Sequence, residues 1–509
     1  MVRHALTLQQ LLQLADCSGS ELAEYPIDLR QLQVTDLTCD SREVKSGTVF
    51  VAIPGSRTDG HTFLFEAATA GAIFAIVRHR NPDLPLPQLE VNCPASTYSQ
   101  LCLKLALGKT NRIQTAGITG TNGKTTTAWM LQAILQAAGR QTGVIGTICH
   151  HDGVGQLPSD MTTPDARVLG ELFNAMSRQG TSHCAMEISS HALVQNRAAG
   201  LQLSAAALTN ITQDHFDYHG DFDSYRTAKA SIVRLLHQEG PLLLNVDDVG
   251  CQQVLSDISE SVPVITCSIE KRDCEISGSI LRQNHRSTTA RLRLAQGDCD
   301  VRIKMVGDHN VSNCLIAAGL AEQMGVDLDA VVEGLQSLSS VPGRLERIDL
   351  GQPFQVFVDY AHTPDALQHC LRTLRSFTTG RVICVFGAGG DRDRSKRPQM
   401  GAAASVADRC FVTSDNPRSE SPEAIIADIV AGISATTSVQ PVVQRQTAIA
   451  IAIQEAEAGD TIVIAGRGHE SMQEVREGFV PLHDAHCVRS VLKALGYGGA
   501  AVPQVYRSA

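Results

Sequence analysis

The sequence lacks several patterns that would assign it to common protein classes. Its 15 cysteines are scattered, and no two stand at Cys-x-x-Cys spacing, so neither a zinc site nor a dithiol redox motif is indicated. We interpret them as reduced and mostly buried thiols. No apolar run reaches the roughly 18 residues that a membrane-spanning helix needs. The first residues, Met1 to His4, show no charged-then-apolar signal pattern. We therefore expect a cytoplasmic protein without a membrane span.

Blocks of like charge are also missing. The formal net charge is −10, and acidic and basic residues are mixed along the chain. This argues against nucleic acid as the main partner. Hydrophobic residues make up 43% and charged residues 19% of the chain, which is typical of a soluble globular protein. A chain of 509 residues is too long for a single core and predicts about three domains.

The most informative stretch runs from Gly117 to Thr127, where an apolar strand-like run breaks into glycines and restarts as a helix. Backbone N–H groups converge in such a turn, and together with the positive end of the helix they form a cradle for phosphates. Lys124 would reach the outer phosphates and Thr125 a Mg²⁺ ion. The strict P-loop pattern wants a glycine at the position of Ile118, so the generic pattern narrowly fails. The alternative is a glycine-rich turn that binds nothing.

Polar clusters follow the ends of further apolar runs, as in doubly wound α/β domains. Glu187 ends one run, where a P-loop domain is expected to hold Mg²⁺, although a lone glutamate there is as often at the surface. The next cluster is denser, because it places Asp214, His215, Asp217 and His219 close together. Such oxygens and imidazoles suit a hard cation. A plain polar turn remains the alternative.

A helix follows in which Tyr225 and Lys229 stand four residues apart and share a face. By itself, this spacing favours a solvated helix lysine. Near the start of the chain, short strands and polar loops indicate a small α/β module. In the last third, the loop from Gly387 to Arg394 looks like half of a dinucleotide fingerprint, but the acidic ribose partner is missing. Tight packing with Arg392 exposed is favoured over phosphate binding.

Taken together, these motifs resemble those of the Mur ligases, the ATP-dependent amino-acid ligases of bacterial cell-wall precursor synthesis. The stretch from Gly120 to Thr126 has the glycine placement of that family, which explains why the generic P-loop pattern fails. Other motifs that carry the resemblance stand in the same order: Asp40–Arg42, Asp59–His61, Met186–Leu193, Asp214–Gly220, Asp359–Asp365 and Asp415–Arg418. The resemblance covers nearly the whole chain.

The resemblance implies an α/β protein of three domains. Residues 1–108 would form an N-terminal domain that binds the UDP substrate, and residues 109–341 a central P-loop ATPase domain with a doubly wound sheet. Residues 342–509 would form a C-terminal Rossmann-like domain that binds the amino acid.

The resemblance also implies a reaction, and it is nearest to the members that add the third residue of the peptide. ATP and Mg²⁺ would activate the D-glutamate carboxylate of UDP-N-acetylmuramoyl-L-alanyl-D-glutamate as an acyl phosphate. The amine of meso-2,6-diaminopimelate would then displace the phosphate. We expect a monomer whose partners are these small molecules.

Site residues carry over by match of motif. The catalytic set would be Lys124, Lys229, His215 and Glu187, and the metal ligands would be Thr125, Glu187, His215 and Lys229, the last as a carbamate. ATP would meet Gly120, Thr121, Asn122, Gly123, Lys124, Thr125, Thr126, Asn310, Asp359 and His362. The UDP substrate would meet Ser41, Ser56, Arg57, Thr58, Thr162, Thr163, Ser189, Gln195 and Arg197. Diaminopimelate would meet Arg392, Asp415, Asn416, Pro417, Arg418, Gly466 and Glu470.

Within this resemblance, Arg418 is the group that would separate diaminopimelate from lysine. The two amino acids differ by one carboxylate, and a guanidinium can bind a carboxylate with two hydrogen bonds. The alternative is a turn with an exposed arginine.

Two departures and two rival functions remain. Residues 56–58 match the family only by position, and residues 482–486 carry fewer acidic residues than relatives often do, so we place no site there. A folylpolyglutamate-synthase-like ligase shares the P-loop but should lack the first domain and the motif Asp415–Arg418. A regulatory P-loop ATPase would not need three substrate-binding domains.

Overall fold

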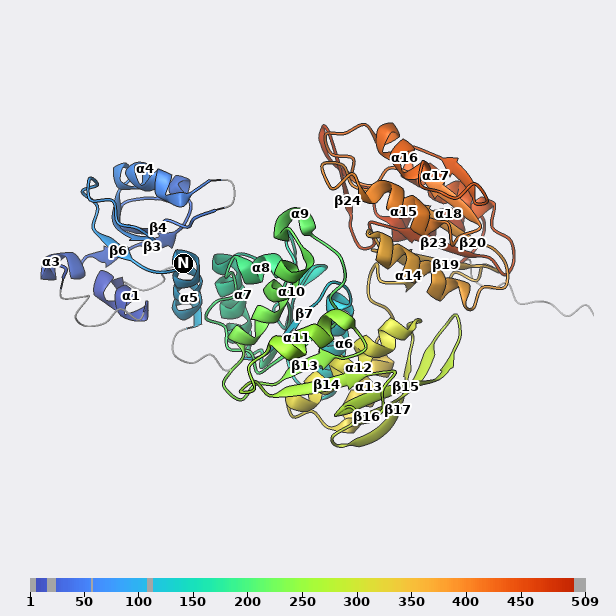
Figure 1. The fold of residues 1–509 in the computed structure, drawn as a ribbon, viewed down its shortest axis with the longest axis horizontal. Helices are drawn as coiled ribbons and strands as arrows, with labels where there is room; N and C mark the ends of the chain where they lie inside the picture. Colours follow the sequence, from blue (N-terminus) through green and yellow to red (C-terminus); the bar gives the residue numbers. More distant parts are fainter. Residues whose placement is uncertain (1–5, 16–23, 56–57, 108–112, 499–509) are drawn as a thin grey trace, which may run out of the picture.

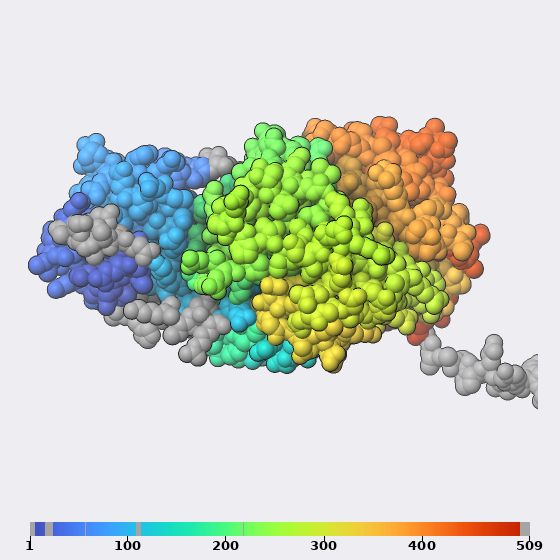
Figure 2. Space-filling model, turned by 60° about the horizontal axis from the view of Figure 1, so that its bottom comes forward, coloured from blue at the N-terminus to red at the C-terminus, as the bar shows by residue number. Residues whose placement is uncertain are grey.

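The structure is a computed structural model that describes residues 6–15, 24–55, 58–107 and 113–498. Three α/β units follow one another along the long axis of the molecule (Figure 1). The space-filling view shows the same order from the N-terminal to the C-terminal end of an elongated body (Figure 2). Each unit has its own sheet with parallel strands, which confirms the predicted α/β class with three domains. The boundaries near residues 108 and 341 remain predictions.

The first unit is built on a four-stranded parallel sheet with strand order β3-β4-β5-β6. Its strands are β1 (Leu6–Thr7), β2 (Gln33–Val34), β3 (Asp36–Thr38), β4 (Thr48–Val51), β5 (Ala72–Val77) and β6 (Gln88–Glu90). Its helices are α1 (Leu8–Leu14), α3 (Ile27–Arg30), η1 (Ser41–Glu43), η2 (Gly60–Phe63), α4 (Leu64–Thr69) and α5 (Pro94–Leu107). Alternate residues of β4 enter opposite cores, so that Val51 packs with α1 and α5 while Phe50 packs with α4.

The second unit carries the predicted P-loop. Its strands are β7 (Gln114–Thr119), β8 (Thr142–Ile145), β9 (Cys149–His151), β10 (Gln156–Pro158), β11 (His183–Glu187), β12 (Ala205–Leu208), β13 (Leu242–Asn245), β14 (Val264–Ser268), β15 (Ile276–Gln283), β16 (Thr288–Leu294) and β17 (Gly297–Ile303). Its helices are α6 (Lys124–Ala137), α7 (Ala166–Gln179), α8 (Ser190–Val194), α9 (Phe216–His219), α10 (Phe222–Ala230), η3 (Ser231–Leu235), α11 (Val249–Asp257), α12 (Asp308–Gln323) and α13 (Leu328–Ser337).

Within the described part of the chain, these strands form one sheet in the order β10-β9-β8-β11-β7-β12-β13-β14-β15-β16-β17. The strands from β8 to β15 pair in parallel, and antiparallel strands extend both edges. Along β12, Ala205 and Ala207 enter the core shared with α6, α12 and α13, while Ala206 and Leu208 enter the core on the other face. Helices therefore cover both faces, and the loops at the carboxyl ends of the strands stay available for a site.

The third unit repeats this plan. Its strands are β18 (Glu346–Arg347), β19 (Gln355–Asp359), β20 (Val382–Phe386), β21 (Arg409–Val412), β22 (Ser438–Pro441), β23 (Thr461–Ala465), β24 (Met472–Val475) and β25 (Gly478–Pro481). Its helices are α14 (Pro364–Arg375), α15 (Lys396–Ala404), α16 (Pro422–Val430), α17 (Arg445–Gln454) and α18 (Asp484–Ala494). The sheet order is β18-β19-β23-β20-β21-β22, parallel except for β18, and β24 and β25 form a separate hairpin.

Among the described residues, no helix combines the length and the apolar character needed to cross a membrane.

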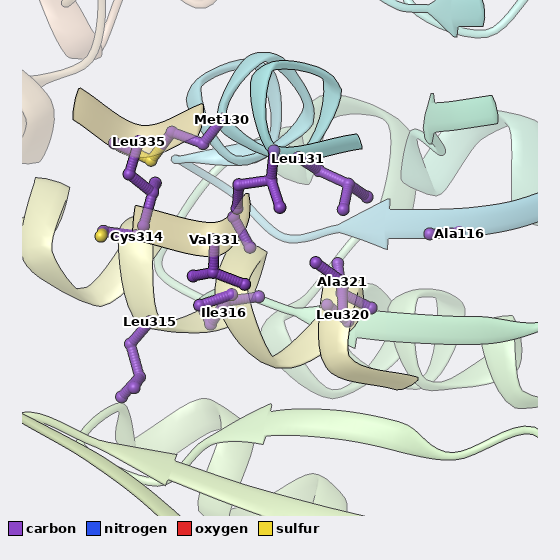
Figure 3. Close-up of a cluster of buried hydrophobic side chains, with 14 of the residues drawn as sticks. Ala116, Met130, Leu131, Cys314, Leu315, Ile316, Leu320, Ala321, Val331 and Leu335 are labelled. Atoms are coloured by element: carbon purple, nitrogen blue, oxygen red, sulfur yellow. The ribbon is translucent and has the colours of Figure 1, made fainter. Parts of the chain in front are cut away.

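Helix α6, which begins at the P-loop, packs against α12 and α13 in one buried hydrophobic cluster (Figure 3). Met130 and Leu131 of α6 face Leu335 and Val331 of α13 in this core. The helices approach closely because residue 334 is glycine. A Cβ atom at Gly334 would lie 2.4 Å from the Cα atom of Ile134, so the two backbones leave no room for a side chain.

We expect Gly334→Ala to lower the free energy of unfolding of the central unit by about 1–3 kcal/mol, because the added methyl group must push α13 away from α6. Trp129 is the single tryptophan of the chain and packs against this core, so its fluorescence in a denaturant titration reports on this unit. Gly155→Ala is the control, since nothing lies within 4 Å of a Cβ atom at that position. Equal stability of the two variants would contradict the prediction.

Candidate functional site

The P-loop lies between two neighbouring strands, because β7 pairs with β11 on one side and β12 on the other. Two of its glycines are required by space and conformation. Gly120 has φ +146°, and a Cβ atom there would lie 1.9 Å from the Oγ1 atom of Thr209. Gly123 has φ +86°, and a Cβ atom there would lie 2.4 Å from the Oδ1 atom of Asn313. The loop therefore keeps a shape that side chains would disrupt.

The residues between these glycines are tied to the loop after β12. The backbone N–H of Thr121 donates to the carbonyl oxygen of Asn210 at 2.9 Å, and that of Asn122 donates to the Oδ1 atom of Asn210, also at 2.9 Å. Lys124 donates to the carbonyl oxygens of Gly120 and Thr121, both at 2.8 Å. Burial lowers the pKa of Lys124, although nearby carboxylates oppose that shift. The loop thus places an ammonium group beside its own backbone cradle.

Glu187 lies at the end of β11 with 0% of its surface exposed. It accepts hydrogen bonds from the Oγ1 atom of Thr125 at 2.8 Å and from the Thr147 backbone N–H and Oγ1, both at 2.9 Å. Thr126, the last predicted P-loop residue, is buried in the same first turn of α6. The structure therefore brings the hydroxyl and the carboxylate of the first predicted metal pair into direct contact.

The helical spacing alone favoured a solvated lysine at position 229, but the structure buries Lys229. It is 2% exposed, and its Nζ atom donates to the carbonyl oxygen of Gly120 at 2.7 Å. The predicted shared face with Tyr225 is confirmed, because the ammonium lies 4.6 Å from the centre of that ring. Burial, followed by repulsion from Lys124, places the pKa of Lys229 well below its usual value. Both causes disfavour the charged form of this side chain.

His215 lies at the start of α9 with φ +53°. Its Nε2 atom is 3.3 Å from the Oδ2 atom of Asp214, and burial is the main cause that lowers its pKa to about 4. Asp214 also accepts an ion pair from Lys396 of the third unit at 3.1 Å. Burial raises the pKa of Asp214, but His215, His362 and Lys396 outweigh it and hold the value at about 2. The side chain of Asp217 lies outside the described residues.

The predicted adenine and ribose positions stand on both sides of the junction between the second and third units. Asn310 is buried at the start of α12, and its Nδ2 atom donates to the carbonyl oxygen of Val306 at 2.8 Å. Asp359 ends β19 and accepts the backbone N–H groups of Leu345 at 2.7 Å and Ala361 at 2.9 Å. His362 follows in the same loop, with Nδ1 2.8 Å from the carbonyl oxygen of Tyr360.

The sequence reasoning missed Arg344, which reaches the P-loop helix from the third unit. Its Nη2 atom donates to the Oγ1 atom of Thr125 at 3.2 Å, and its guanidinium lies 4.4 Å from the centre of the Tyr360 ring. No sequence pattern connects Arg344 to Thr125. The residue before it, Gly343, has φ +65° and packs against the backbone at Gly468 and His469.

Four predicted substrate residues of the central unit form one hydrogen-bonded group. Thr163 donates to the carbonyl oxygen of Glu187 at 3.0 Å and accepts the backbone N–H of Ser189 at 2.9 Å. Arg197 donates to the carbonyl oxygen of Thr163 at 2.9 Å and to the Oε1 atom of Gln195 at 2.6 Å. Thr162 lies beside this group, 3.0 Å from the Oγ1 atom of Thr147. The group therefore starts at the strand that carries Glu187.

The predicted uridine residues belong to the first unit. Ser41 donates to Glu66 at 3.2 Å from the turn η1. That turn is fixed to α7 of the second unit, because Arg167 donates to Glu43 and to Asp36, both at 3.2 Å. Thr58 is exposed, whereas Ser56 and Arg57 lie outside the described residues.

The predicted amino-acid residues converge on the loops after β20, β21 and β23. Asn416 donates to Glu470 at 2.9 Å, and a Cβ atom at Gly466 would lie 2.5 Å from the Oδ2 atom of Asp415. Burial, followed by Asp415, raises the pKa of Glu470. The second of these loops packs on the first, since a Cβ atom at Gly390 would lie 1.9 Å from the carbonyl oxygen of Pro417.

Arg418 and Arg392 flank the same loop. Arg418 has φ +52°, and it donates to the Oε2 atom of Glu474 at 2.6 Å and to the carbonyl oxygen of Gly390 at 2.7 Å. Arg392 is exposed, as predicted, and a Cβ atom at Gly389 would lie 3.0 Å from the Nη1 atom of Arg418 and 3.6 Å from the Cγ atom of Arg392. The Nε and Nη1 atoms of Arg418 make these bonds, which leaves Nη2 for a further acceptor.

The described residues contain no cluster of three His, Cys, Asp or Glu side chains that could hold a metal ion by themselves. Thr125 and Glu187 nevertheless fit one Mg²⁺, because both offer hard oxygen atoms beside the phosphate cradle. Mg²⁺ is commonly held by one or two carboxylates together with substrate phosphates and water.

Three family models match most of the chain. The Mur ligase family catalytic domain matches residues 33–109, the Mur ligase middle domain residues 118–321, and the Mur ligase glutamate ligase domain residues 343–468. The chain belongs to the Mur ligase family.

Relatives within this family match over nearly their whole length. The UDP-N-acetylmuramoyl-L-alanyl-D-glutamate–2,6-diaminopimelate ligase of Syntrophomonas wolfei is 38% identical, and the match covers 93% of this chain and 97% of that one. The ligase of the same name from Gloeobacter violaceus is also 38% identical, over 92% and 97%.

Solved structures of the family share the fold. One titled as a UDP-N-acetylmuramoyl-L-alanyl-D-glutamate–2,6-diaminopimelate ligase has a TM-score of 0.68 at 30% identity, covering 97% of this chain and all of that one. A folylpolyglutamate synthase of Mycobacterium tuberculosis has a TM-score of 0.57 at 22% identity and covers only 72% of this chain and 91% of its own. The rival ligase thus leaves more than a quarter of this chain unmatched.

We expect Arg344→Ala to weaken the binding of a non-hydrolysable ATP analogue by roughly tenfold to a hundredfold, because a charged hydrogen-bond donor beside the phosphate cradle is lost. Isothermal calorimetry measures the dissociation constant directly. Arg347→Ala is the matched control, since that arginine bonds Asp349 and Gln355 instead. Similar losses in both variants would show that the effect is not specific to Arg344.

Proposed function

We propose that this protein is an ATP-dependent, ADP-forming ligase that adds meso-2,6-diaminopimelate to UDP-N-acetylmuramoyl-L-alanyl-D-glutamate in peptidoglycan precursor synthesis. The observation that carries the proposal is the match to diaminopimelate ligases at 38% identity over more than nine-tenths of the chain. The amino-acid motif from Asp415 to Arg418 and its neighbours supports the choice of amino acid. The first unit supports a nucleotide-linked substrate over a folate.

Phosphoryl transfer needs positioning and charge stabilisation more than covalent help from the protein. The D-glutamate γ-carboxylate attacks the γ-phosphorus of ATP, an O–P bond forms, and ADP leaves. Lys124 moves from the carbonyl oxygens of its own loop to the phosphate oxygens and holds the charge of the transferring group. Arg344 approaches the same place from the third unit. Asn310, Asp359 and His362 hold the adenosine at the junction.

The residues around the cradle also suit two magnesium ions. Bound Mg²⁺ would neutralise phosphate charge during the transfer. Thr125 and Glu187 would hold one ion, and His215 with Lys229 the other. Lys229 can serve only as an anion, and its buried neutral amine is the form that adds CO₂, with an N–C bond formed and one proton released. The resulting carbamate offers oxygen ligands where the free amine offers none.

In the second step, the amine of diaminopimelate attacks the acyl phosphate, and phosphate leaves through a tetrahedral intermediate. Arg418 would bind the carboxylate at the far end of the amino acid through its remaining Nη2 atom, with Arg392 beside it. Asn416 and Glu470 would bind the rest of that end. Thr162, Thr163, Ser189, Gln195 and Arg197 would hold the muramoyl dipeptide, and Ser41 with residues 56–58 the uridine.

We propose further that the enzyme acts as a monomer in the cytoplasm. A single chain carries all three sets of substrate-binding residues, so a second copy is not required to complete the site. ATP and a nucleotide-linked precursor are cytoplasmic compounds.

The function is tested by incubating the purified protein with ATP, Mg²⁺ and the UDP-dipeptide, with and without diaminopimelate. We expect a UDP-tripeptide and one ADP per product. Release of ADP without a tripeptide would favour a regulatory ATPase, and ligation of glutamate to a folate would favour the rival ligase.

Lys229→Ala should abolish ligation, because it removes the carbamate. Short carboxylates such as acetate or formate should partly restore the rate by supplying the missing oxygen atoms. The measurement is the steady-state rate across a carboxylate titration, with Lys271→Ala as the control because that lysine bonds the Val246 carbonyl away from the loop. An active Lys229→Ala variant that ignores added carboxylate would contradict the role.

The wild type should prefer meso-diaminopimelate over lysine by at least about a hundredfold in kcat/KM, because lysine brings no carboxylate to the Nη2 atom of the partly buried Arg418. Arg418→Ala should remove most of this preference. Steady-state kinetics with both amino acids gives the ratio. Arg476→Ala is the control, since that exposed arginine bonds the carbonyl oxygen of Ser419 nearby. A wild-type ratio under about tenfold would refute the assignment.

A further inference from the structure

A fully buried arginine outside the proposed binding set lies in the same loop as Gly466. Arg467 has 0% of its surface exposed. Its Nη2 atom donates to the carbonyl oxygens of Met472 at 2.7 Å and Leu482 at 3.2 Å, and its Nη1 atom donates to the Oδ1 atom of Asn416 at 2.6 Å. One guanidinium therefore ties the loop after β23 to both ends of the β24–β25 hairpin and to the loop after β21.

These contacts determine which way the Asn416 amide points. Its Oδ1 atom accepts from Arg467 and from the backbone N–H of Glu474 at 2.9 Å. Both partners can only donate, so the oxygen must face them and the NH₂ group must face the other side. That NH₂ group donates to the Oε2 atom of Glu470 at 2.9 Å. Asn416 thus presents a donor, not an acceptor, toward the amino-acid site.

The same arginine also holds Glu470. The Oε2 atom of Glu470 lies 3.4 Å from the Nη1 atom of Arg467 in addition to its bond with Asn416. The positive charge of Arg467 opposes the rise in the pKa of Glu470 that burial and Asp415 cause. One carboxylate oxygen is fixed in this way, and the Oε1 atom remains for the ammonium group of a ligand.

The hydrogen bonds that begin at Arg467 continue to Arg418, the arginine proposed to bind the carboxylate of the amino acid. Glu474, whose N–H is held by Asn416, accepts from the Nε atom of Arg418 at 2.6 Å through its side chain. Its backbone carbonyl accepts the N–H of Arg418 at 3.1 Å. The position of Arg418 consequently depends on Glu474, which Asn416 and Arg467 hold in turn.

We propose that Arg467 is a positioning residue for amino-acid selection, which orients Asn416 and Glu470 and, through Glu474, Arg418. The proposal rests on the proposed function and extends its amino-acid site. The guanidinium is required because three oxygen acceptors lie in different directions within one buried space. A lysine ammonium is a point charge on a flexible stem and cannot reproduce that planar fork.

Arg467→Lys is the decisive variant. We expect its KM for meso-diaminopimelate to rise about tenfold or more, because the Asn416 amide loses one of the two donors that fix its orientation. Its KM values for ATP and the UDP-dipeptide should stay near those of the wild type, since those substrates bind elsewhere. Its preference for diaminopimelate over lysine should fall. A loss confined to one substrate is not expected from general loosening of the fold.

The matched control is Arg445→Lys. Arg445 is another buried arginine of this unit, 2% exposed, and its hydrogen bonds go to Asp484 and the carbonyl oxygen of Ala465, not to Asn416 or Glu470. We expect it to lower the melting temperature while leaving the KM for diaminopimelate near the wild-type value. An equal rise of that KM in both variants would overturn the proposal.

A double-mutant cycle tests the route of the effect. If Arg467 acts through Asn416, Arg467→Lys should raise the KM much less in the Asn416→Ala background than in the wild type. Independent, fully additive effects would overturn the proposal. Arg467→Gln, which keeps a donor for Asn416 but no charge, is the second variant. If neither Arg467 variant folds, the residue is structural and the proposal fails.

The test of the Arg467 role can be distinguished from the test of the proposed function. Failure of the wild type to ligate diaminopimelate refutes the function, and the Arg467 variants are then compared by calorimetric binding of the amino acid that the wild type accepts. Unchanged affinity in Arg467→Lys would refute the positioning role alone.

Discussion

The hydrogen bonds of the buried Glu187 carboxylate are the interaction on which the geometry of the P-loop, the proposed phosphate site, depends. Glu187 lies in a parallel strand next to the P-loop strand, so its oxygens meet the first turn of α6 and the loop after β8 at one edge of the sheet. Removing it would deprive the Thr125 hydroxyl and the Thr147 backbone N–H of this acceptor. The third unit docks on the same hydroxyl, because Arg344 donates to Thr125. Docking and phosphate binding therefore share one set of atoms.

Two lysines approach a single carbonyl oxygen, and their mutual repulsion shapes the chemistry. Lys124 and Lys229 both donate to Gly120, at 2.8 and 2.7 Å. Burying two ammonium groups so close together is costly unless one loses its charge. Lys229 is the more buried of the two and has the strongly lowered pKa. The repulsion therefore disfavours charge on Lys229 more than on Lys124, in keeping with the separate roles proposed for the two side chains.

Much of the fold and part of the site could be predicted from sequence. The apolar runs that end at Glu187, Asp359 and Gly387 are strands whose carboxyl ends carry polar groups, and strand periodicity is a local property of the chain. The burial of Lys229 could not be predicted from its helical spacing, although the family resemblance placed it in the site. A lysine on a helix is solvated unless another segment covers it, and the covering carbonyl comes from Gly120 across the fold. Arg344 and Arg467 were missed for a similar reason. Their partners, Thr125 and Asn416, are distant in sequence, and no spacing pattern connects them.

Selection of the amino acid is built on different physics from phosphate transfer. The proposed phosphate site relies mainly on charge, which tolerates changes in ligand shape. The amino-acid site relies on the direction of each donor, because diaminopimelate and lysine differ by one carboxylate at nearly equal length. The direction of a donor is preserved only if the group that carries it is fixed. In the proposed amino-acid site, the buried guanidinium of Arg467 bridges separate loops and fixes Asn416 and Glu470. An arginine that would contact no substrate can therefore decide which substrate is accepted, because it fixes whether Asn416 offers a donor or an acceptor.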